Sequence, residues 1–136
     1  MKLDAMLDGI LPAPADADQI EITSVTADSR YVAPGSLFAA LPGSQVDGAK
    51  FVPDAIEGGA SAVLTALKSD VGSADVPVLR ADDPRRVLAL LAARFYARQP
   101  ENIVAVTGTS GKTSVADFAR QIFAALGRQS ASVGTI

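Results

Sequence analysis

The stretch from residue 102 to residue 127 constrains the fold of this chain more than any other. It opens with a short apolar, β-branched run at residues 103–106, which predicts a buried strand. A glycine-containing turn follows at residues 107–114, and the apolar residues beyond it recur at the spacing of one helix face: Val115, Phe118, Ala119, Ile122, Phe123 and Leu126. Gly127 stands where such a helix would end in a left-handed residue. A strand, a glycine turn and a helix in this order predict a phosphate-binding loop.

The residue types of that turn, called the phosphate loop below, suit a nucleoside triphosphate. Glycines let successive backbone N–H groups converge on an anion, and the start of the helix adds its unpaired N–H groups. Lys112, the expected catalytic residue, can neutralise charge on the β- and γ-phosphates, and the Thr113 hydroxyl can bind Mg²⁺. The residues expected to bind the nucleotide are Gly108, Thr109, Ser110, Gly111, Lys112, Thr113 and Ser114. Val106 stands where the full P-loop pattern has glycine, so a plain strand-to-helix turn with an exposed lysine is the alternative.

The amino-acid composition restricts the kinds of molecule that the chain can bind and the chemistry that it can carry. Hydrophobic residues make up 49% and charged residues 20% of the 136 positions, which is typical of a soluble globular chain. The net charge of −3, with dispersed Lys and Arg, argues against a nucleic-acid partner. The absence of Cys excludes disulfides and thiolate metal sites, and the absence of His excludes imidazole catalysis. Because we find neither a signal peptide nor a membrane-spanning run, we expect a cytoplasmic protein without a membrane partner.

Before the phosphate loop, apolar segments separated by turn residues predict a small α/β module. The expected helices cover residues 3–10, 49–57 and 84–98, and the expected strands cover residues 20–25, 36–41, 62–64 and 76–79. A break near residue 100 separates this module, residues 1–99, from a second unit, residues 100–136, which would hold the first β-α-β unit of a P-loop domain and end in a strand at residues 130–133. One β-α-β unit cannot bury both faces of a sheet, so we expect the chain to be the front of a longer enzyme.

Four motifs along the chain point to one family. TADSR occupies residues 26–30, and PGSLFAALPG follows at residues 34–43. DGAKF lies at residues 47–51, and VTGTSGKT lies at residues 106–113. With these motifs the chain resembles, over essentially its whole length, the Mur ligases of peptidoglycan synthesis, most closely the MurE type that adds a diamino acid. In this family Val106 is ordinary, whereas Ser110 stands where Asn is more frequent.

The resemblance implies that residues 1–99 bind UDP-N-acetylmuramoyl-L-alanyl-D-glutamate and that residues 100–136 begin the ATP-binding central domain. The positions that match substrate-contacting residues of MurE-type ligases are Ala27 and Ser29, with Ser44, Gln45 and Val46 in the following loop. Arg30 is a further candidate, because its planar guanidinium suits phosphate. From the residues alone, a plain turn in which Asp28 bonds the backbone is the favoured interpretation of this motif, and the resemblance reverses that order.

The activity that the resemblance implies is ATP-dependent amide ligation. The D-glutamate carboxylate would attack the γ-phosphate of ATP, and the amine of a diamino acid, meso-diaminopimelate or L-lysine, would displace phosphate from the acyl phosphate. The general base, the remaining metal ligands and the amino-acid pocket would lie beyond Ile136, so this chain alone is expected to be inactive and the full-length enzyme to be a monomer. The alternatives are a MurF-type ligase, a non-catalytic nucleotide-sugar-binding module and an unrelated P-loop ATPase or GTPase.

Overall fold

A computed structural model describes residues 1–43 and 47–134 of the chain. Its contacts divide the chain into two compact units, Met1–Gln99 and Pro100–Ile136, which are described separately below. Within the described residues, none of the helices combines the length and the apolar character needed to cross a bilayer.

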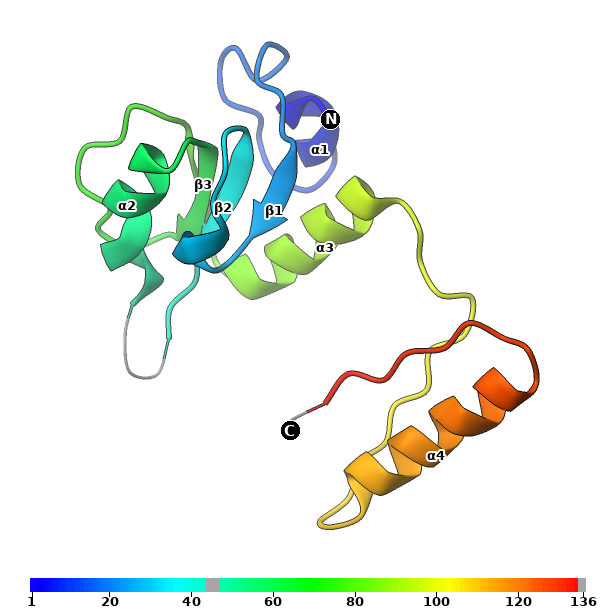
Figure 1. Ribbon diagram of the computed structural model, residues 1–136. Coiled ribbons are helices and arrows are strands. Elements are labelled where there is room, and N and C mark those ends of the chain that lie inside the picture. The colour runs from blue at the N-terminus through cyan, green and yellow to red at the C-terminus, as the bar shows by residue number, and fades with distance from the viewer. Residues whose placement is uncertain (44–46, 135–136) are drawn as a thin grey trace. The chain divides into compact units, whose positions relative to one another are not determined.

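The first unit is built on a sheet of four parallel strands in the order β1-β2-β3-β4 (Figure 1). The strands are β1 (Ser24–Thr26), β2 (Ser36–Ala40), β3 (Ala60–Ala66) and β4 (Val78–Ala81). Every residue of β2 is buried, as is most of β3. Parallel strands covered on both faces show this continuous burial rather than an alternation of apolar and polar residues.

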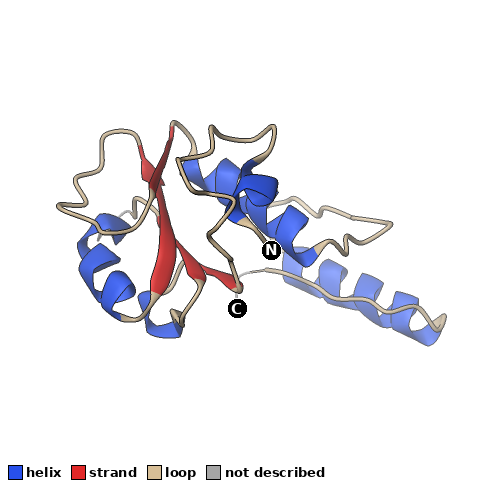
Figure 2. Cartoon of the chain, turned by 90° about the horizontal axis from the view of Figure 1, so that it is seen from above, coloured by secondary structure: helices blue, strands red, loops and turns tan. Residues whose placement is uncertain are grey.

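Helices cover both faces of that sheet (Figure 2). On one face, α1 (Leu3–Leu7) and α3 (Pro84–Tyr96) pack against alternate strand residues such as Leu37 and Leu64. On the other face, α2 (Val52–Glu57) and the short 3₁₀ helix η2 (Gly48–Phe51) pack against the intervening strand residues, such as Phe38, which lies between Leu37 and Ala39 in β2. The two clusters confirm the α/β class expected from the sequence, because successive strand residues point to opposite faces.

Helix α3 follows the end signals of its sequence closely. Asp83 caps its first turn by accepting a hydrogen bond from the Arg86 N–H at 3.0 Å, and Pro84 is its first residue. The helix ends at Tyr96, two residues before the expected end, where Ala97 turns left-handed with φ 56°. Near that end, the Arg94 guanidinium donates to the carbonyl oxygen of Met6 at 3.0 Å and so ties α3 to α1.

The amino-terminal segments are more irregular than predicted. The expected helix over residues 3–10 is a five-residue helix, and the strand expected over residues 20–25 has ladder partners only from Ser24 onward. Glu21 instead makes an isolated antiparallel bridge with Lys2, and Ile22 is buried beside α1. Alternation of apolar and polar residues was therefore a correct sign of burial, but tertiary packing against α1 replaced the predicted strand pairing.

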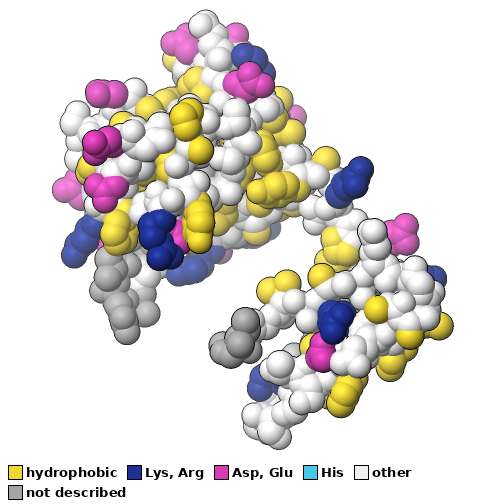
Figure 3. Space-filling model, viewed as in Figure 1, with side chains coloured by type: hydrophobic (Ala, Val, Ile, Leu, Met, Phe, Trp, Pro, Cys, Tyr) yellow, Lys and Arg dark blue, Asp and Glu magenta, His cyan; other side chains and the backbone are white. Residues whose placement is uncertain are grey.

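The second unit contains one helix, α4 (Lys112–Ala125), within its described residues. The strands predicted at residues 103–106 and 130–133 do not form there, because a strand needs a hydrogen-bonded neighbour and the described residues of this unit provide none. Apolar side chains gather along one side of α4 (Figure 3). Phe118 and Ile122, which their spacing in the helix places on one face, are more than half exposed. The end of the helix was predicted correctly: Gly127 has φ 77°, and its N–H bonds the Ala124 carbonyl oxygen at 2.9 Å.

Candidate functional site

The phosphate loop has the backbone conformation that its glycines predict. Gly111 is the residue before α4 and has φ 75°, a left-handed conformation in which other residues are strained. Gly108 has φ 155°. The whole loop, residues 107–114, is exposed. The turn therefore presents its backbone to solvent rather than packing it into a core.

The start of α4 has backbone N–H groups without a capping side chain and an ammonium nearby. No described side chain caps the helix, so its first N–H groups have no partner within the helix or from a capping residue. The Lys112 ammonium lies beside the loop and donates a hydrogen bond to the carbonyl oxygen of Gly108. An ammonium beside the loop and unpaired N–H groups at the positive end of a helix are both suited to bind phosphate oxygens.

The metal-binding capacity of the described residues is small. Residues 1–43 and 47–134 contain no group of three or more acidic side chains close enough together to hold a metal ion. Thr113, in the first turn of α4, offers a hydroxyl oxygen of the kind that Mg²⁺ accepts beside nucleotide phosphates. The residues present thus fit one protein ligand of a Mg²⁺ ion whose other ligands are phosphate, water or groups elsewhere.

The structure brings the described substrate candidates to one edge of the parallel sheet. Ala27, Ser29 and Arg30 follow the carboxyl end of β1 and form or flank the 3₁₀ helix η1 (Ser29–Tyr31). Strand β1 pairs with β2, so the loop that leaves β2 at residue 41 starts from the same edge. The carboxyl edge of an open parallel sheet is the usual place for a ligand in α/β proteins.

The turn after β1 has the geometry of the plain-turn interpretation of its sequence. Asp28 caps η1 by accepting a hydrogen bond from the Arg30 N–H at 3.0 Å, which is the plain turn expected from the residues alone. The Arg30 guanidinium also bonds the same carboxylate, with Nη2 to Oδ2 at 2.6 Å. These hydrogen bonds, the one from the Arg30 side chain first, hold the pKa of Asp28 below its usual value. Asp28 therefore occupies part of the Arg30 guanidinium. The role of Arg30 toward phosphate stays a prediction.

The remaining predicted substrate residues, Ser44, Gln45 and Val46, lie outside the described residues. On either side of them, Pro42 and Asp47 form an antiparallel bridge, and the Asp47 carboxylate accepts a hydrogen bond from the Ala49 N–H at 3.0 Å. Asp47 therefore has a structural role, because its carboxylate caps η2. Sequence reasoning missed Arg85, whose guanidinium reaches this loop from α3 and donates to the Pro42 carbonyl oxygen at 2.8 Å. The available signal was the pair of arginines at the start of a helix, where cations are disfavoured.

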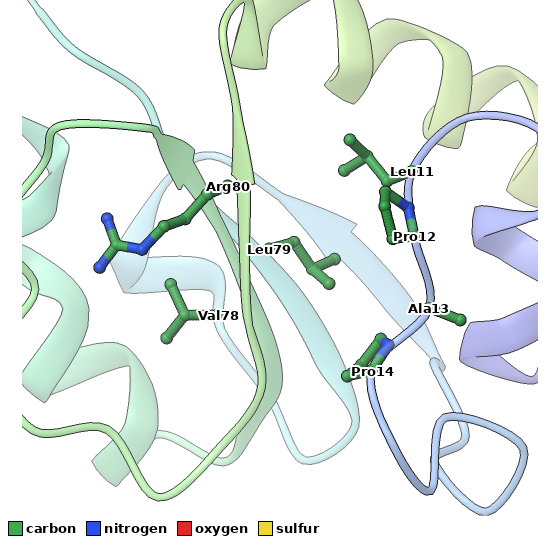
Figure 4. Close-up of a pocket in the computed structure, with 7 residues that line it drawn as sticks. All are labelled: Leu11, Pro12, Ala13, Pro14, Val78, Leu79 and Arg80. Carbon is green, nitrogen blue, oxygen red and sulfur yellow. The ribbon is translucent and has the colours of Figure 1, made fainter.

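A shallow cleft elsewhere in the first unit has different chemistry. It has a volume of 310 Å³ and lies between the segment at residues 11–14 and strand β4. Leu79 points into it toward Leu11 and Pro12, whereas Val78 and Arg80 point to the other side of the strand (Figure 4). None of the predicted site residues lines this cleft. Its apolar walls and its position on the last strand separate it from the edge formed by the ends of β1 and β2.

Comparison with known proteins identifies the family to which this fold belongs. The sequence model of the family described as "Mur ligase family, catalytic domain" matches residues 21–96, more than half of the chain. The chain belongs to the Mur ligase family. The matched residues include the whole parallel sheet, so the resemblance seen in the sequence motifs is confirmed in the first unit.

Two curated relatives extend this Mur ligase likeness beyond the sheet. The chain is 55% identical over 123 residues to the UDP-N-acetylmuramoyl-L-alanyl-D-glutamate--2,6-diaminopimelate ligase of Brucella melitensis, a match that covers 90% of this chain and 25% of the relative. It is 52% identical over 136 residues to the enzyme of the same name from Chelativorans sp., and this match covers 99% of the chain and 28% of the relative. The chain thus spans about a quarter of the length of these relatives.

A solved structure agrees at the level of the fold. The structure of a UDP-N-acetylmuramoyl-L-alanyl-D-glutamate--2,6-diaminopimelate ligase superimposes with a TM-score of 0.69 at 23% identity, covering 93% of this chain and 26% of that protein. At this identity the likeness establishes the fold of the Mur ligase chain and leaves its chemistry to be argued from the residues.

Proposed function

We propose that this chain is the amino-terminal part of an ATP-dependent ligase that joins 2,6-diaminopimelate to UDP-N-acetylmuramoyl-L-alanyl-D-glutamate in peptidoglycan synthesis. The observation that carries the proposal is the 55% identity to a relative named for that reaction, over 90% of this chain. The two sites agree with it in kind: a parallel-sheet edge with polar loops, and an exposed phosphate loop at a helix start. We also propose a cytoplasmic location, because the reaction consumes ATP and a nucleotide-linked precursor.

In this proposal the two units divide the work. Residues 1–99 bind the UDP-linked substrate at the carboxyl edge of the sheet, through Ala27, Ser29 and Arg30 and through Ser44, Gln45 and Val46. A hydroxyl, loop N–H groups and a guanidinium are the donors that a uracil edge and a diphosphate require. Residues 100–136 begin the ATP-binding domain, in which residues 108–114 surround the triphosphate.

The proposed reaction builds up negative charge on the phosphate oxygens, which the phosphate loop is placed to neutralise. The D-glutamate carboxylate attacks the γ-phosphorus of ATP, ADP leaves, and the amine of diaminopimelate then displaces inorganic phosphate from the acyl phosphate to form the amide. Lys112 lies at the loop and neutralises negative charge that builds on the phosphate oxygens during the first step. Thr113 contributes a hydroxyl ligand to Mg²⁺, which when bound withdraws charge from the same oxygens.

The test is a phosphate-release assay on the full-length protein. We expect release of inorganic phosphate only when ATP, the UDP-linked muramoyl dipeptide and diaminopimelate are all supplied. Release with a D-Ala-D-Ala acceptor and a UDP-linked tripeptide, but not with diaminopimelate, would identify a MurF-type ligase instead. Release that ignores the UDP-linked substrate would identify an unrelated ATPase, and binding of that substrate without any release would identify a non-catalytic module.

A further inference from the structure

The loop that follows β2 is closed at its base by backbone contacts. We call residues 41–43 and 47–48, which form this base, the neck. The Gly48 N–H bonds the Leu41 carbonyl oxygen at 3.0 Å, next to the bridge between Pro42 and Asp47. A Cβ at position 48 would lie 2.6 Å from the Leu41 carbonyl oxygen, closer than side chains tolerate, so the neck requires glycine there. The two arms of the neck are therefore held to each other.

Between described residues, a long-range hydrogen bond ties the neck to α3 at this edge. Arg85 lies in the first turn of α3, and its Nη2 donates to the Pro42 carbonyl oxygen at 2.8 Å across 43 positions of sequence. Among the described side chains it is the one on α3 that bonds this loop. The apolar face of α3, with Leu91 at its centre, packs on the sheet and fixes the base from which Arg85 extends.

The position of Arg85 is unfavourable for the helix that carries it. A cation in the first turn faces the positive end of the helix dipole, and α3 has two arginines there and no acidic residue within that turn. Arg86, the second of them, makes no side-chain hydrogen bond within the described residues, whereas Arg85 spans to Pro42. Helix stability thus gives no reason for a cation at position 85, and the bond to the neck does.

We propose that Arg85 is a positioning residue that holds the neck at the carboxyl edge of the sheet, the edge at which Ala27 and Ser29 follow β1, and so preorganises this edge for the UDP-linked substrate. The inference rests on the proposed function. A neck whose arms are already held in place loses less conformational entropy when substrate binds, so the contribution of Arg85 appears in affinity. Arg85 does not touch the reacting atoms in this scheme, and the chemical step is independent of it.

The test compares three variants of the full-length ligase. Arg85→Ala is expected to raise the KM for the UDP-linked substrate by between about threefold and tenfold, with kcat changed by less than about twofold, since one charge-assisted hydrogen bond is lost. Arg86→Ala removes the same charge from the adjacent position and is expected to leave both parameters near those of the parent enzyme. Arg85→Lys should recover part of the affinity, because an ammonium can donate to the same carbonyl oxygen.

Amide hydrogen exchange at Gly48 separates this inference from the proposed function. In the protein without substrate, Arg85→Ala should speed exchange of the Gly48 N–H, whereas Arg86→Ala should not. If the parent protein fails to release phosphate with the UDP-linked substrate, the proposed function is wrong, and faster Gly48 exchange still supports the role of Arg85 at the neck. Unchanged Gly48 exchange, an unchanged KM, or a loss confined to kcat would each overturn the positioning role.

Discussion

The two units of this chain bury comparable apolar faces to very different degrees. In Met1–Gln99, the Phe38 side chain of β2 packs under the helices on its face of the sheet and is 1% exposed. In Pro100–Ile136, Phe118 lies on an apolar helix face of the same kind and is 62% exposed. The first unit has a sheet with helices on both sides, whereas the described part of the second has a single helix. Periodicity identifies the face that is to be buried, but burial itself needs a second layer.

The largest expected effect tests this comparison directly with one substitution in each unit. Phe38→Ala should lower the free energy of unfolding of the first unit by about 3–5 kcal/mol, because it leaves a cavity in a closed core. Phe118→Ala in the same 136-residue chain should change stability by less than about 0.5 kcal/mol, as exposed positions do. Urea denaturation followed by far-UV circular dichroism measures both.

The same two substitutions can also be compared in the full-length ligase. If α4 gains a second layer there, the cost of Phe118→Ala should rise toward that of Phe38→Ala. Equal and large costs already in the 136-residue chain would show that the apolar face of α4 is covered, contrary to the contrast drawn between the units.

The second prediction separates the two units by their ligands. Lys112→Ala in the full-length ligase should lower ATP turnover by roughly 10²–10³-fold, the usual loss when one group that stabilises developing charge is removed. Binding of the UDP-linked substrate, measured by calorimetry, should stay near that of the parent, because that site is proposed to lie in the first unit.

A matched control is Arg128→Ala, which removes one positive charge from the same unit just beyond α4. It should leave turnover intact. Loss of UDP-substrate binding together with turnover in Lys112→Ala would mean that the two units do not act as separate binding sites.

Much of the first unit could be predicted because its signals are local. Strand β2 is bounded by turn residues, and α3 begins at Asp83 and Pro84 as their capping preferences require. The same holds for the end of α4 at Gly127. In each case the residues that decide the structure are neighbours in sequence.

The sequence-based predictions failed where residues distant in sequence decide the local structure. The run at residues 103–106 has strand composition, yet the described residues of its unit offer no strand to pair with. Likewise, Arg85 could be noticed as a cation out of place, but its partner Pro42 lies 43 positions earlier and only the folded sheet brings them together. The conformation of the phosphate loop was predictable from Gly111, whereas the link between two loops of the sheet edge was not.

A third, smaller effect compares glycines that are required for different reasons. Gly48→Ala forces a Cβ against the backbone of Leu41, so we expect a loss of about 1–3 kcal/mol in the stability of the first unit. Gly111→Ala meets no atom within 4 Å but adopts φ 75°, which costs about 1–2 kcal/mol in the phosphate loop alone.

Thermal unfolding should therefore shift for the first variant and not for the second, whose effect should appear as weaker ATP binding by the full-length ligase. Gly111→Asn serves as the control, because Asn tolerates the left-handed conformation and should retain more ATP affinity than alanine. A Gly48→Ala protein with unchanged stability would contradict the crowding at the neck.

The smallest effects concern one carboxylate in each unit that is paired locally with an arginine. Hydrogen bonds from Arg30 lower the pKa of Asp28, and hydrogen bonds from Arg120, then Gln121, lower the pKa of Asp117. A carboxylate whose pKa is lower in the folded state adds stability above its ordinary pKa of 3.8, and this stability is lost as the pH falls through the lowered value. Both pairs are partly exposed, so each contribution is small and screened by salt.

Carboxyl-carbon NMR titration can follow the two groups separately. Arg30→Gln should return the pKa of Asp28 toward its usual value without moving that of Asp117, and Arg120→Gln should do the reverse. Coupling between the two titrations would contradict the local origin of both pKa shifts. A return of each pKa in its own variant alone would show that both short-range pairs form locally, because their partners are only two and three residues apart in sequence.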